Sequence, residues 1–289
     1  MDGHEIEGYI TARRIGDATV TLINDGVLGA IPLIPWMQAP PDEVRREAPE
    51  ADVNGMLISS GLISAFVQSG EASILIDPGA GEVDADARLV TTFKFRPTPG
   101  VQAGLAAIGV LPTQITHVLL THAHGDHVTG TTAARGGWRF PRYPRARYII
   151  NRADWSGNAA GDATTSEAGI HLEALDRRGL LDLIDGDTEV APGVTMIAAP
   201  GESPGHSIVH VASAGVHFSY LGDLFHHPCE VSHPDWVMVG RDKKAMIASR
   251  QRLIADAVST GATLVATHNV FPGWGRIIRV GTGTRWEDA

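Results

Sequence analysis

The chain has 289 residues, of which 43% are hydrophobic and 19% are charged, and this balance is typical of a folded globular protein rather than of a disordered or membrane chain. Acidic residues outnumber basic ones by 33 to 23, and the resulting formal net charge of −10 disfavours nucleic acid as a partner. The single cysteine, Cys229, excludes an intramolecular disulfide and a thiolate cluster, so a bound metal would have to be held by histidine and carboxylate.

The distribution of apolar and charged residues along the chain bears on its location and its domain organisation. No apolar stretch approaches the roughly 20 residues that a membrane helix needs, so we expect no membrane span. The first ten residues lack the basic start and apolar run of a secretory signal, which favours a cytoplasmic protein. No linker or low-complexity tract divides the chain, and we expect a single domain over residues 1–289.

The N-terminal part predicts a strand followed by a proline-rich insertion. Ala18–Leu22 alternates and is β-branched, then meets Asn24-Asp25-Gly26, which predicts a strand that ends in a turn. Residues 31–49 contain five prolines around a short charged piece, whose helix would begin at Pro41 or Asp42. We interpret residues 31–49 as an arm or lid that either caps the active site or pairs with a second subunit in a homodimer.

The remaining elements alternate between short strands and helices. The sequence predicts strands at Met56–Ile58, Ile63–Gln68, Ser73–Ile76, His117–Leu120, Ala146–Ile150, Val194–Ala198, Val209–Ala212, Val216–Leu221 and Thr263–Ala266. It predicts helices at Val101–Ile108, Glu167–Arg178 and Lys243–Val258, the last with an apolar stripe at helical spacing. Strands with interspersed helices suggest helices packed outside two sheets.

A histidine-rich run follows the strand that ends at Leu120. His122, His124, Asp126 and His127 fall within six residues, and Gly125 between them permits a tight turn. Neutral imidazole and carboxylate are ligands that suit zinc and similar divalent ions. The run therefore predicts a metal site in a loop at a strand end, where catalytic groups usually project; surface histidines on a loop are the alternative.

The run Thr121-His122-Ala123-His124-Gly125-Asp126-His127, followed by Gly130, resembles the signature of the metallo-β-lactamase superfamily. Matches to the remaining ligands of that family also occur in its order: His206 in Pro-Gly-His-Ser, Asp223 in Leu-Gly-Asp and His268 in Ala-Thr-His. The resemblance covers the chain from about Asn54 to the C-terminus. It implies an α/β fold of the αββα sandwich type, with two mixed sheets and helices outside.

The resemblance also implies the ligand set. His122, His124 and His206 would hold one metal ion, Asp126, His127 and His268 would hold the other, and Asp223 would bridge them. The implied cofactors are two divalent metal ions, with zinc as the leading choice and iron, manganese or cobalt as alternatives. Asp77 matches the family's Asp-x-Gly turn, whose carboxylate supports a metal-bound histidine, and a simple turn former is the competing interpretation.

The implied chemistry is metal-assisted hydrolysis of a small-molecule substrate. Two divalent ions lower the pKa of a bridging water from about 15.7 toward neutrality and so give a metal-bridging hydroxide as nucleophile. Asp126 is then a candidate catalytic residue, as a proton acceptor or donor. His226 is a second candidate, because it could hydrogen-bond the substrate oxygen or leaving group; an ordinary surface or core histidine is the alternative.

Several branches of the superfamily are disfavoured. Class B β-lactamases commonly carry cysteine where this chain has Asp223, flavodiiron enzymes have glutamate in place of His124, and the acidic balance disfavours the nucleic-acid-processing members. Many N-acyl homoserine lactone lactonases carry tyrosine at the position of His226, which disfavours that substrate. Residues 221–226 look more like methyl parathion hydrolase and its relatives.

We therefore predict a dimetal hydrolase, a metal-dependent enzyme acting on a lactone, carboxylic ester or organophosphate ester. A glyoxalase II-like thioesterase and a mononuclear-iron persulfide dioxygenase, which would use His122, His124 and His206 with Asp223, are the alternatives. A β-lactamase and a non-catalytic binding module are less favoured.

The remaining histidines, the cysteine and several aromatic residues are interpreted as parts of the core, the surface or a pocket wall rather than as metal ligands. His117, His210 and His217 lie in predicted strands and are expected to be ordinary core or surface residues. Cys229 is expected to be inert. Four aromatic residues are expected either to line an apolar pocket over the metals or to belong to the core: Trp36, Phe225, Phe271 and Trp274.

Overall fold

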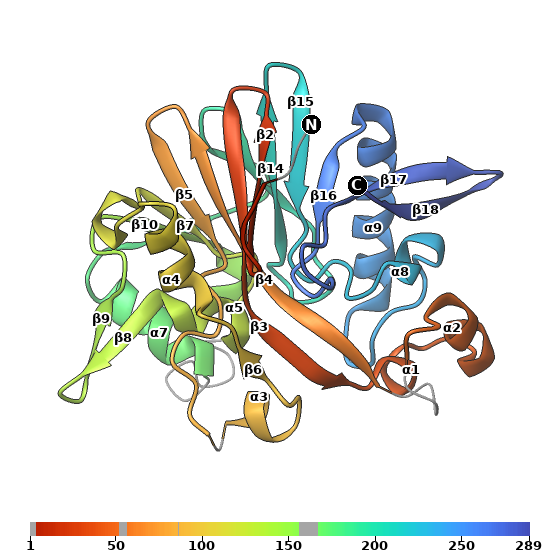
Figure 1. Cartoon of the computed structure of the whole chain (residues 1–289), viewed down its shortest axis with the longest axis horizontal. Helices are drawn as coiled ribbons and strands as arrows, with labels where there is room; N and C mark the ends of the chain where they lie inside the picture. The colour runs from red at the N-terminus through yellow and green to blue at the C-terminus, as the bar shows by residue number, and fades with distance from the viewer. Residues whose placement is uncertain (1–3, 52–56, 86, 156–166) are drawn as a thin grey trace.

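The computed structural model describes residues 4–51, 57–85, 87–155 and 167–289, and it contains two large sheets (Figure 1). The first sheet has the order β1-β2-β3-β4-β5-β7-β10-β11, with β6 paired to β3. Its antiparallel half runs from β1 to β5, whereas β5, β7, β10 and β11 are parallel. Its strands are β1 (His4–Glu7), β2 (Ile10–Ile15), β3 (Ala18–Ile31), β4 (Ile58–Ser69), β5 (Ala72–Ile76), β6 (Arg96–Pro97), β7 (His117–Leu119), β10 (Arg147–Asn151) and β11 (Leu181–Ile184).

The second sheet follows the chain order from β12 to β18, and only β15 and β16 pair in parallel within it. Its strands are β12 (Thr188–Ala191), β13 (Val194–Ala198), β14 (Ser207–Ser213), β15 (Val216–Tyr220), β16 (Thr263–Val265), β17 (Gly275–Val280) and β18 (Gly283–Asp288). A separate hairpin is formed by β8 (Thr132–Arg135) and β9 (Trp138–Pro141).

The helices lie in the connections between strands. They are α1 (Leu33–Trp36), α2 (Pro41–Glu47), α3 (Arg88–Thr91), α4 (Gly100–Ala107), α5 (Gly125–Val128), α7 (Glu167–Asp176), α8 (Cys229–Ser232) and α9 (Lys243–Thr260), with short 3₁₀ turns at Pro112–Gln114 and Thr129–Thr131. Among the described residues, no helix combines the length and apolar character needed to cross a membrane.

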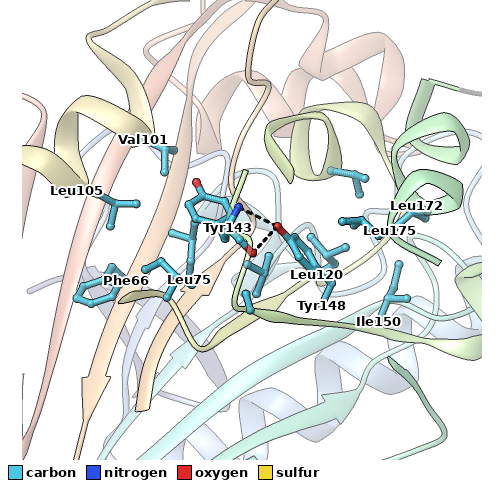
Figure 2. Packing of buried hydrophobic residues seen from close by; sticks show 14 of the residues in the cluster. Phe66, Leu75, Val101, Leu105, Leu120, Tyr143, Tyr148, Ile150, Leu172 and Leu175 are labelled. Carbon is cyan, nitrogen blue, oxygen red and sulfur yellow. Dashed lines mark hydrogen bonds between the residues drawn. The ribbon is translucent and has the colours of Figure 1, made fainter. Parts of the chain in front are cut away.

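Three buried clusters show how the layers stack. Side chains of β5 illustrate the two-residue period of a strand, because Ile74 and Ile76 pack between the two sheets while Leu75 faces outward. The outer face of the first sheet is covered by α4 and α7, which supply Leu105 and Leu172 to the cluster drawn in Figure 2. On the other side, α9 covers the second sheet (Figure 1). The four layers confirm the predicted αββα sandwich.

Figure 2 also shows a polar contact inside the helix-covered cluster. The hydroxyl of Tyr148 donates to the carbonyl of Tyr143 at 3.2 Å and accepts from the backbone N–H of the same residue at 3.0 Å. The buried phenol is thereby satisfied, as a polar group in an apolar core requires.

The predicted turn at Asn24-Asp25-Gly26 is wrong. Strand β3 continues through these residues, and its register against β4 shifts between Asn24 and Gly26, which is a β-bulge. The carboxylate of Asp25 accepts hydrogen bonds from the backbone N–H groups of Ala80 and Val101, so it links the bulge to two distant segments. Burial nevertheless raises the pKa of Asp25 above its ordinary value.

The two predicted strands at Met56–Ile58 and Ile63–Gln68 are one strand, β4, and Met56 lies outside the described residues. Gly61 does not interrupt it. A Cβ at Gly61 would lie 2.3 Å from the carbonyl oxygen of Asn269, so glycine here permits a close approach of two backbones.

The predicted helices agree with α4, α7 and α9 to within two residues at each end.

The proline-rich residues 31–49 form α1 and α2, and α2 begins at Pro41, one of the two expected positions. Val44 and Ala48 pack with Ile58 of β4 and with Trp236, so the arm is attached to the sandwich by its own buried cluster. Cys229 lies in the same cluster, and burial raises the pKa of its thiol, which agrees with the expectation that it is inert.

Candidate metal centre

The ligand-type side chains lie in loops at one edge of the two sheets. The histidine run follows β7, Asp223 follows β15 and His268 follows β16, while His206 directly precedes β14. Strands β15 and β16 are parallel, so the residues that follow them emerge at the same edge. The topology thus brings together segments that are far apart in the sequence.

The described residues contain two groups of at least three metal-ligand-type side chains whose ligand atoms lie within 4.8 Å of one another. The first group, here called cluster 1, consists of His122, His124, Glu202 and Asp223. The second group, cluster 2, consists of Asp126, His127 and His268.

Asp223, a member of cluster 1, also faces the histidines of cluster 2. Its Oδ1 is 3.2 Å from Nε2 of His127, and its Oδ2 is 3.3 Å from Nε2 of His268 and 3.7 Å from Nε2 of His122. The side chain is 4% exposed. A carboxylate in this position can reach a cation in either cluster.

Asp77 orients His127. Its Oδ2 is 2.8 Å from Nδ1 of His127 and accepts from the hydroxyl of Thr121, while its Oδ1 accepts from the backbone N–H of Thr121. Asp77 also has a φ of 47°, in the left-handed region. Asp77 therefore both forms the turn after β5 and holds a histidine of cluster 2, so the two interpretations left open by the sequence apply together.

The buried atoms at the centre fit a cation. With Nδ1 of His127 bonded to Asp77, its Nε2 points to Oδ1 of Asp223, and neither atom has a hydrogen-bond partner of acceptable geometry. Two buried atoms that are left unpaired cost free energy unless a positive charge lies between them. His268 is arranged in the same way, because its Nδ1 bonds the carbonyl of Gly61 at 3.1 Å and its Nε2 faces Asp223 and Asp126.

His206 differs from the other predicted ligands. Its Nδ1 bonds the carbonyl of Ala199 at 3.0 Å, and its Nε2 accepts the backbone N–H of Asp223 at 3.1 Å. Its ring centroid lies 5.2 Å from that of His122. The structure therefore places His206 beside cluster 1 rather than within it, and its role as a ligand stays a prediction.

Glu202 was not predicted from the sequence. It lies in the loop between β13 and β14, and its side chain is fully buried in contact with cluster 1. The only signal in the sequence is an acidic residue in the Pro-Gly-rich stretch four residues before His206. That signal is weak, because acidic residues are common in loops.

Buried charges shift the pKa values at the centre. Burial alone would disfavour the charged form of Asp223, but His268 and His127 outweigh it and hold the pKa of this carboxyl well below its usual range. Burial likewise opposes protonation of His268, but Asp223 outweighs it and raises the pKa of His268 to about 9; the pKa of His127 is raised for the same reason. Burial lowers the pKa of His122 and of His206.

Asp154 joins the two loops that carry cluster 1 and His206. Its Oδ2 accepts from the backbone N–H of Ala123 at 2.7 Å and from the hydroxyl of Ser203 at 2.8 Å, and its Oδ1 accepts from the N–H of Gly205 at 2.5 Å. Asp154 was not predicted from the sequence, because nothing in its local sequence points to partners that are distant along the chain.

His226 lies at the centre as well. Its Nε2 is 3.5 Å from Oδ2 of Asp223 and 3.8 Å from Oε2 of Glu202, and its ring stacks on that of His268 with centroids 5.7 Å apart. Its backbone N–H donates to Glu230, whose other carboxylate oxygen is 2.6 Å from Nη2 of the fully buried Arg250. A buried ion pair thus holds the loop that carries His226.

A pocket of about 510 Å³ opens over both clusters, and His124, Asp126, Asp223, His226 and His268 line its floor. Its apolar lining comes from β3, from the arm, from α3 with the residues after it, and from the segment before α9: Leu28, Ile31, Trp36, Leu89, Phe93 and Met238.

Of the four aromatic residues considered in the sequence, Trp36 alone lines this pocket. Phe225 and Trp274 are buried in the core, and Phe271 packs against it.

The three histidines given structural interpretations behave as expected. His117 is half-buried on β7, and His210 and His217 form a half-buried pair across β14 and β15 with ring nitrogens 3.2 Å apart. None of them lines the pocket or belongs to either cluster of the described residues.

Comparisons with known proteins give relatives of one kind. N-acyl homoserine lactonases from Bacillus thuringiensis and Bacillus cereus are 25% and 26% identical to this chain over 171 and 170 residues. The matches span 54% of this chain and 60% and 62% of the lengths of these relatives.

Solved structures of similar fold cover nearly the whole chain. AidC, a dizinc quorum-quenching lactonase solved with a product, has a TM-score of 0.78 at 22% identity, with 97% of each chain covered. A probable metal-dependent hydrolase from Staphylococcus aureus has a TM-score of 0.79 at 21% identity, with 91% of this chain and 94% of that chain covered. At these identities the likeness establishes the fold.

The sequence profile of the metallo-beta-lactamase superfamily matches residues 61–268, a range that contains every ligand-type residue of both clusters. The match extends over more than half of the chain and agrees with the sandwich and with the edge at which the centre lies. The chain therefore belongs to the metallo-beta-lactamase superfamily.

Proposed function

We propose that this protein is a dimetal hydrolase that acts on a lactone or a related ester. The observation that carries the proposal is that the Asp223 carboxylate of cluster 1 also faces cluster 2, where its Oδ1 and Nε2 of His127 lie 3.2 Å apart, both buried and both without a hydrogen bond of good geometry. Such a donor set of imidazole and carboxylate suits divalent ions of the zinc type.

We assign the ligands as the resemblance implies. His122, His124 and His206 hold the first ion, Asp126, His127 and His268 hold the second, and Asp223 binds both. Zinc is the leading choice, supported by the dizinc AidC structure, and iron, manganese and cobalt are the alternatives. The presence of a complete second cluster favours two ions over the single iron of a persulfide dioxygenase.

When bound, the two ions supply Lewis acidity toward the substrate oxygen and lower the pKa of water toward neutrality. The residues of the chain then perform two tasks. The carboxylate of Asp126, which is 20% exposed and lines the pocket, accepts a proton and delivers it to the leaving group. The imidazole of His226, which lines the pocket beside Asp223, hydrogen-bonds the substrate oxygen.

The apolar walls select a substrate with a hydrophobic substituent, because burial of apolar surface contributes most of the binding energy in such pockets. The curated relatives are N-acyl homoserine lactonases, which supports lactones as the leading candidate substrates. His226 distinguishes this chain from the lactonases with tyrosine at that position, so carboxylic esters and organophosphate esters follow as further candidate substrates. A cytoplasmic location and a homodimer stay predictions from the sequence.

The test combines metal analysis with a substrate panel. We expect close to two ions per purified chain and turnover of lactones above that of esters, thioesters and phosphotriesters. Asp223→Ala should lose one or both ions and lower kcat/KM by about a hundredfold or more, because it removes the ligand shared by both clusters. Asp84→Ala, which removes an exposed carboxylate, is the control. A single tightly held iron and no esterase or lactonase activity would refute the proposal.

A further inference from the structure

The loop Pro200–Gly205 is fixed against the start of α9. Its Gly201 has a φ of 143°, and a Cβ there would lie 2.5 Å from the backbone of Met246. The carbonyl of Gly201 accepts from the N–H of Asp242 at 3.0 Å, and the carbonyl of Pro200 accepts from the hydroxyl of Ser249 at 2.7 Å. The backbone that carries Glu202 is therefore held in one position by the helix behind it.

This position directs Glu202 into the centre. Its Oε1 lies 3.5 Å from Nδ1 of His124 and its Oε2 lies 3.8 Å from Nε2 of His226, and the side chain has no exposed surface. Neither carboxylate oxygen has a hydrogen-bond partner of acceptable geometry, although Nη2 of Arg241 forms an ion pair with Oε1 at 2.5 Å. The guanidinium of Arg241 balances the charge of this fully buried carboxylate, but both oxygens still lack a hydrogen bond of good geometry and so keep the capacity to bind a metal ion.

We propose that Glu202 is an additional ligand of the first metal ion, beside the His122, His124, His206 and Asp223 assigned above, and that the ion pair with Arg241 holds its carboxylate in place. The proposal rests on the dimetal function proposed above. The four side chains of cluster 1 already have ligand atoms within 4.8 Å of one another, which leaves them able to share one ion. Carboxylates that bind metals are usually hydrogen-bonded by such an outer partner.

The donor set has a consequence for metal preference. Glu202 adds an oxygen donor to the first site. Oxygen donors favour harder ions such as Mn²⁺, whereas imidazole nitrogen favours ions such as Zn²⁺. Removing Glu202 should therefore weaken Mn²⁺ binding at one site more than Zn²⁺ binding at that site.

The experiment measures metal binding rather than activity. Wild type, Glu202→Gln, Arg241→Gln and the control Glu167→Gln are stripped of metal and titrated with Zn²⁺ and Mn²⁺ against a competing chelator. Glu167 is a suitable control because it lines the same pocket but belongs to neither cluster. We expect Glu202→Gln to weaken one of the two binding steps by about tenfold to a hundredfold, Arg241→Gln to weaken it less, and Glu167→Gln to leave it unchanged.

The Co²⁺ form of each variant gives a second readout. Loss of a ligand lowers the coordination number of one ion, so the visible absorption of Co²⁺ in Glu202→Gln should become more intense than in wild type. Wild-type affinities and spectrum in Glu202→Gln, or equal losses in Glu202→Gln and Arg241→Gln, would show that Glu202 is only the ion-pair partner of Arg241. If wild type binds fewer than two ions, the proposed dimetal function fails. If wild type binds two ions and Glu202→Gln behaves as wild type, only the proposal for Glu202 fails.

Discussion

Each histidine at the centre uses its two ring nitrogens for different tasks. Nδ1 of His127 is bound to Asp77, and Nδ1 of His268 is bound to the carbonyl of Gly61, so each ring is fixed with Nε2 toward Asp223. The tautomer and the ring angle are thereby set before any ligand arrives. His226 differs, since its buried Nδ1 has no hydrogen-bond partner and its ring is positioned by stacking on His268.

Replacing His226 with asparagine should separate catalysis from metal binding. We expect His226→Asn to lower kcat by about a hundredfold, because proton transfer and hydrogen bonding by a placed imidazole contribute at least that much. Metal content should stay at the wild-type value. His227→Asn is the matched control, since the neighbouring His227 bonds Glu50 and does not line the pocket. Equal losses of kcat in both variants would contradict a specific role for His226.

At the scale of elements, α8 and α9 support the centre from behind. Arg250 of α9 donates to the carbonyls of Leu224 and Trp236 and pairs with Glu230 of α8, and both side chains of this pair have no exposed surface. Glu230 in turn accepts from the backbone N–H groups of His226 and His227. The longest helix therefore stabilises the loop between Asp223 and α8 as well as the core.

Breaking this pair should be costly. We expect Arg250→Met to lower the free energy of unfolding by about 3–5 kcal/mol, because it leaves the buried carboxylate of Glu230 without its cation. The double variant Glu230→Gln/Arg250→Met should recover part of the loss, since it removes both charges. Urea denaturation at pH 7.5 measures both values. An Arg250→Met protein within about 1 kcal/mol of wild type would show that the pair is not coupled in this way.

The arm at residues 31–49 is the second element that bears on function. Trp36 lines the pocket and packs edge-on against Phe93 with ring centroids 5.6 Å apart. We expect Trp36→Ala to raise KM about tenfold for lactones with long acyl chains, a loss of about 1.4 kcal/mol of binding, with kcat unchanged. Trp138→Ala, on the exposed face of the β8–β9 hairpin, is the control. An equal rise in KM for short and long substrates would argue against the arm as a cap.

At the scale of the whole molecule, stability depends on buried groups far from the centre. His171 of α7 is buried, and its Nδ1 lies 2.8 Å from the hydroxyl of Thr132. Burial, together with the charges of Arg139 and Arg142, lowers the pKa of His171 from 6.5 to about 3. In the folded protein this histidine therefore stays neutral at pH values at which the unfolded chain would protonate it.

The sign of the pH dependence follows. Between pH 6.5 and pH 3 the unfolded state binds the extra proton, so the contribution of His171 is complete above pH 6.5 and is lost as the pH falls. Lowering the pH from 6.5 to 5 should cost the wild type about 2 kcal/mol through this group, and His171→Gln should lack that loss. Urea denaturation of both metal-loaded proteins between pH 8 and pH 5 tests this. Above pH 7.5 the free energies of unfolding of wild type and His171→Gln should change with pH in parallel, because the histidine is neutral in both states there. If the two curves also stay parallel below pH 6.5, the expectation is wrong.

The sequence by itself determined the approximate strand and helix positions, because strand and helix periods are local properties. The run from His122 to His127 places four ligand-type residues close together and carries the family resemblance, which in turn implied the sandwich. The resemblance also implied His206, Asp223 and His268 as further candidate ligands, through short motifs in the family's order. The bulge at Asp25 was mistaken for a turn, since its hydrogen bonds to Ala80 and Val101 depend on segments more than 50 residues away.

Only the tertiary structure decided how the centre is completed. Glu202 and Asp154 carry no motif, and their positions depend on loops held by α9 and by the strands of both sheets. The dual role of Asp77 and the arrangement of His206 beside cluster 1 are likewise matters of distance and direction between segments. A local pattern can specify which residue types are present, but burial and orientation arise only when the two sheets pack together, and these decide which side chains face the proposed metal ions.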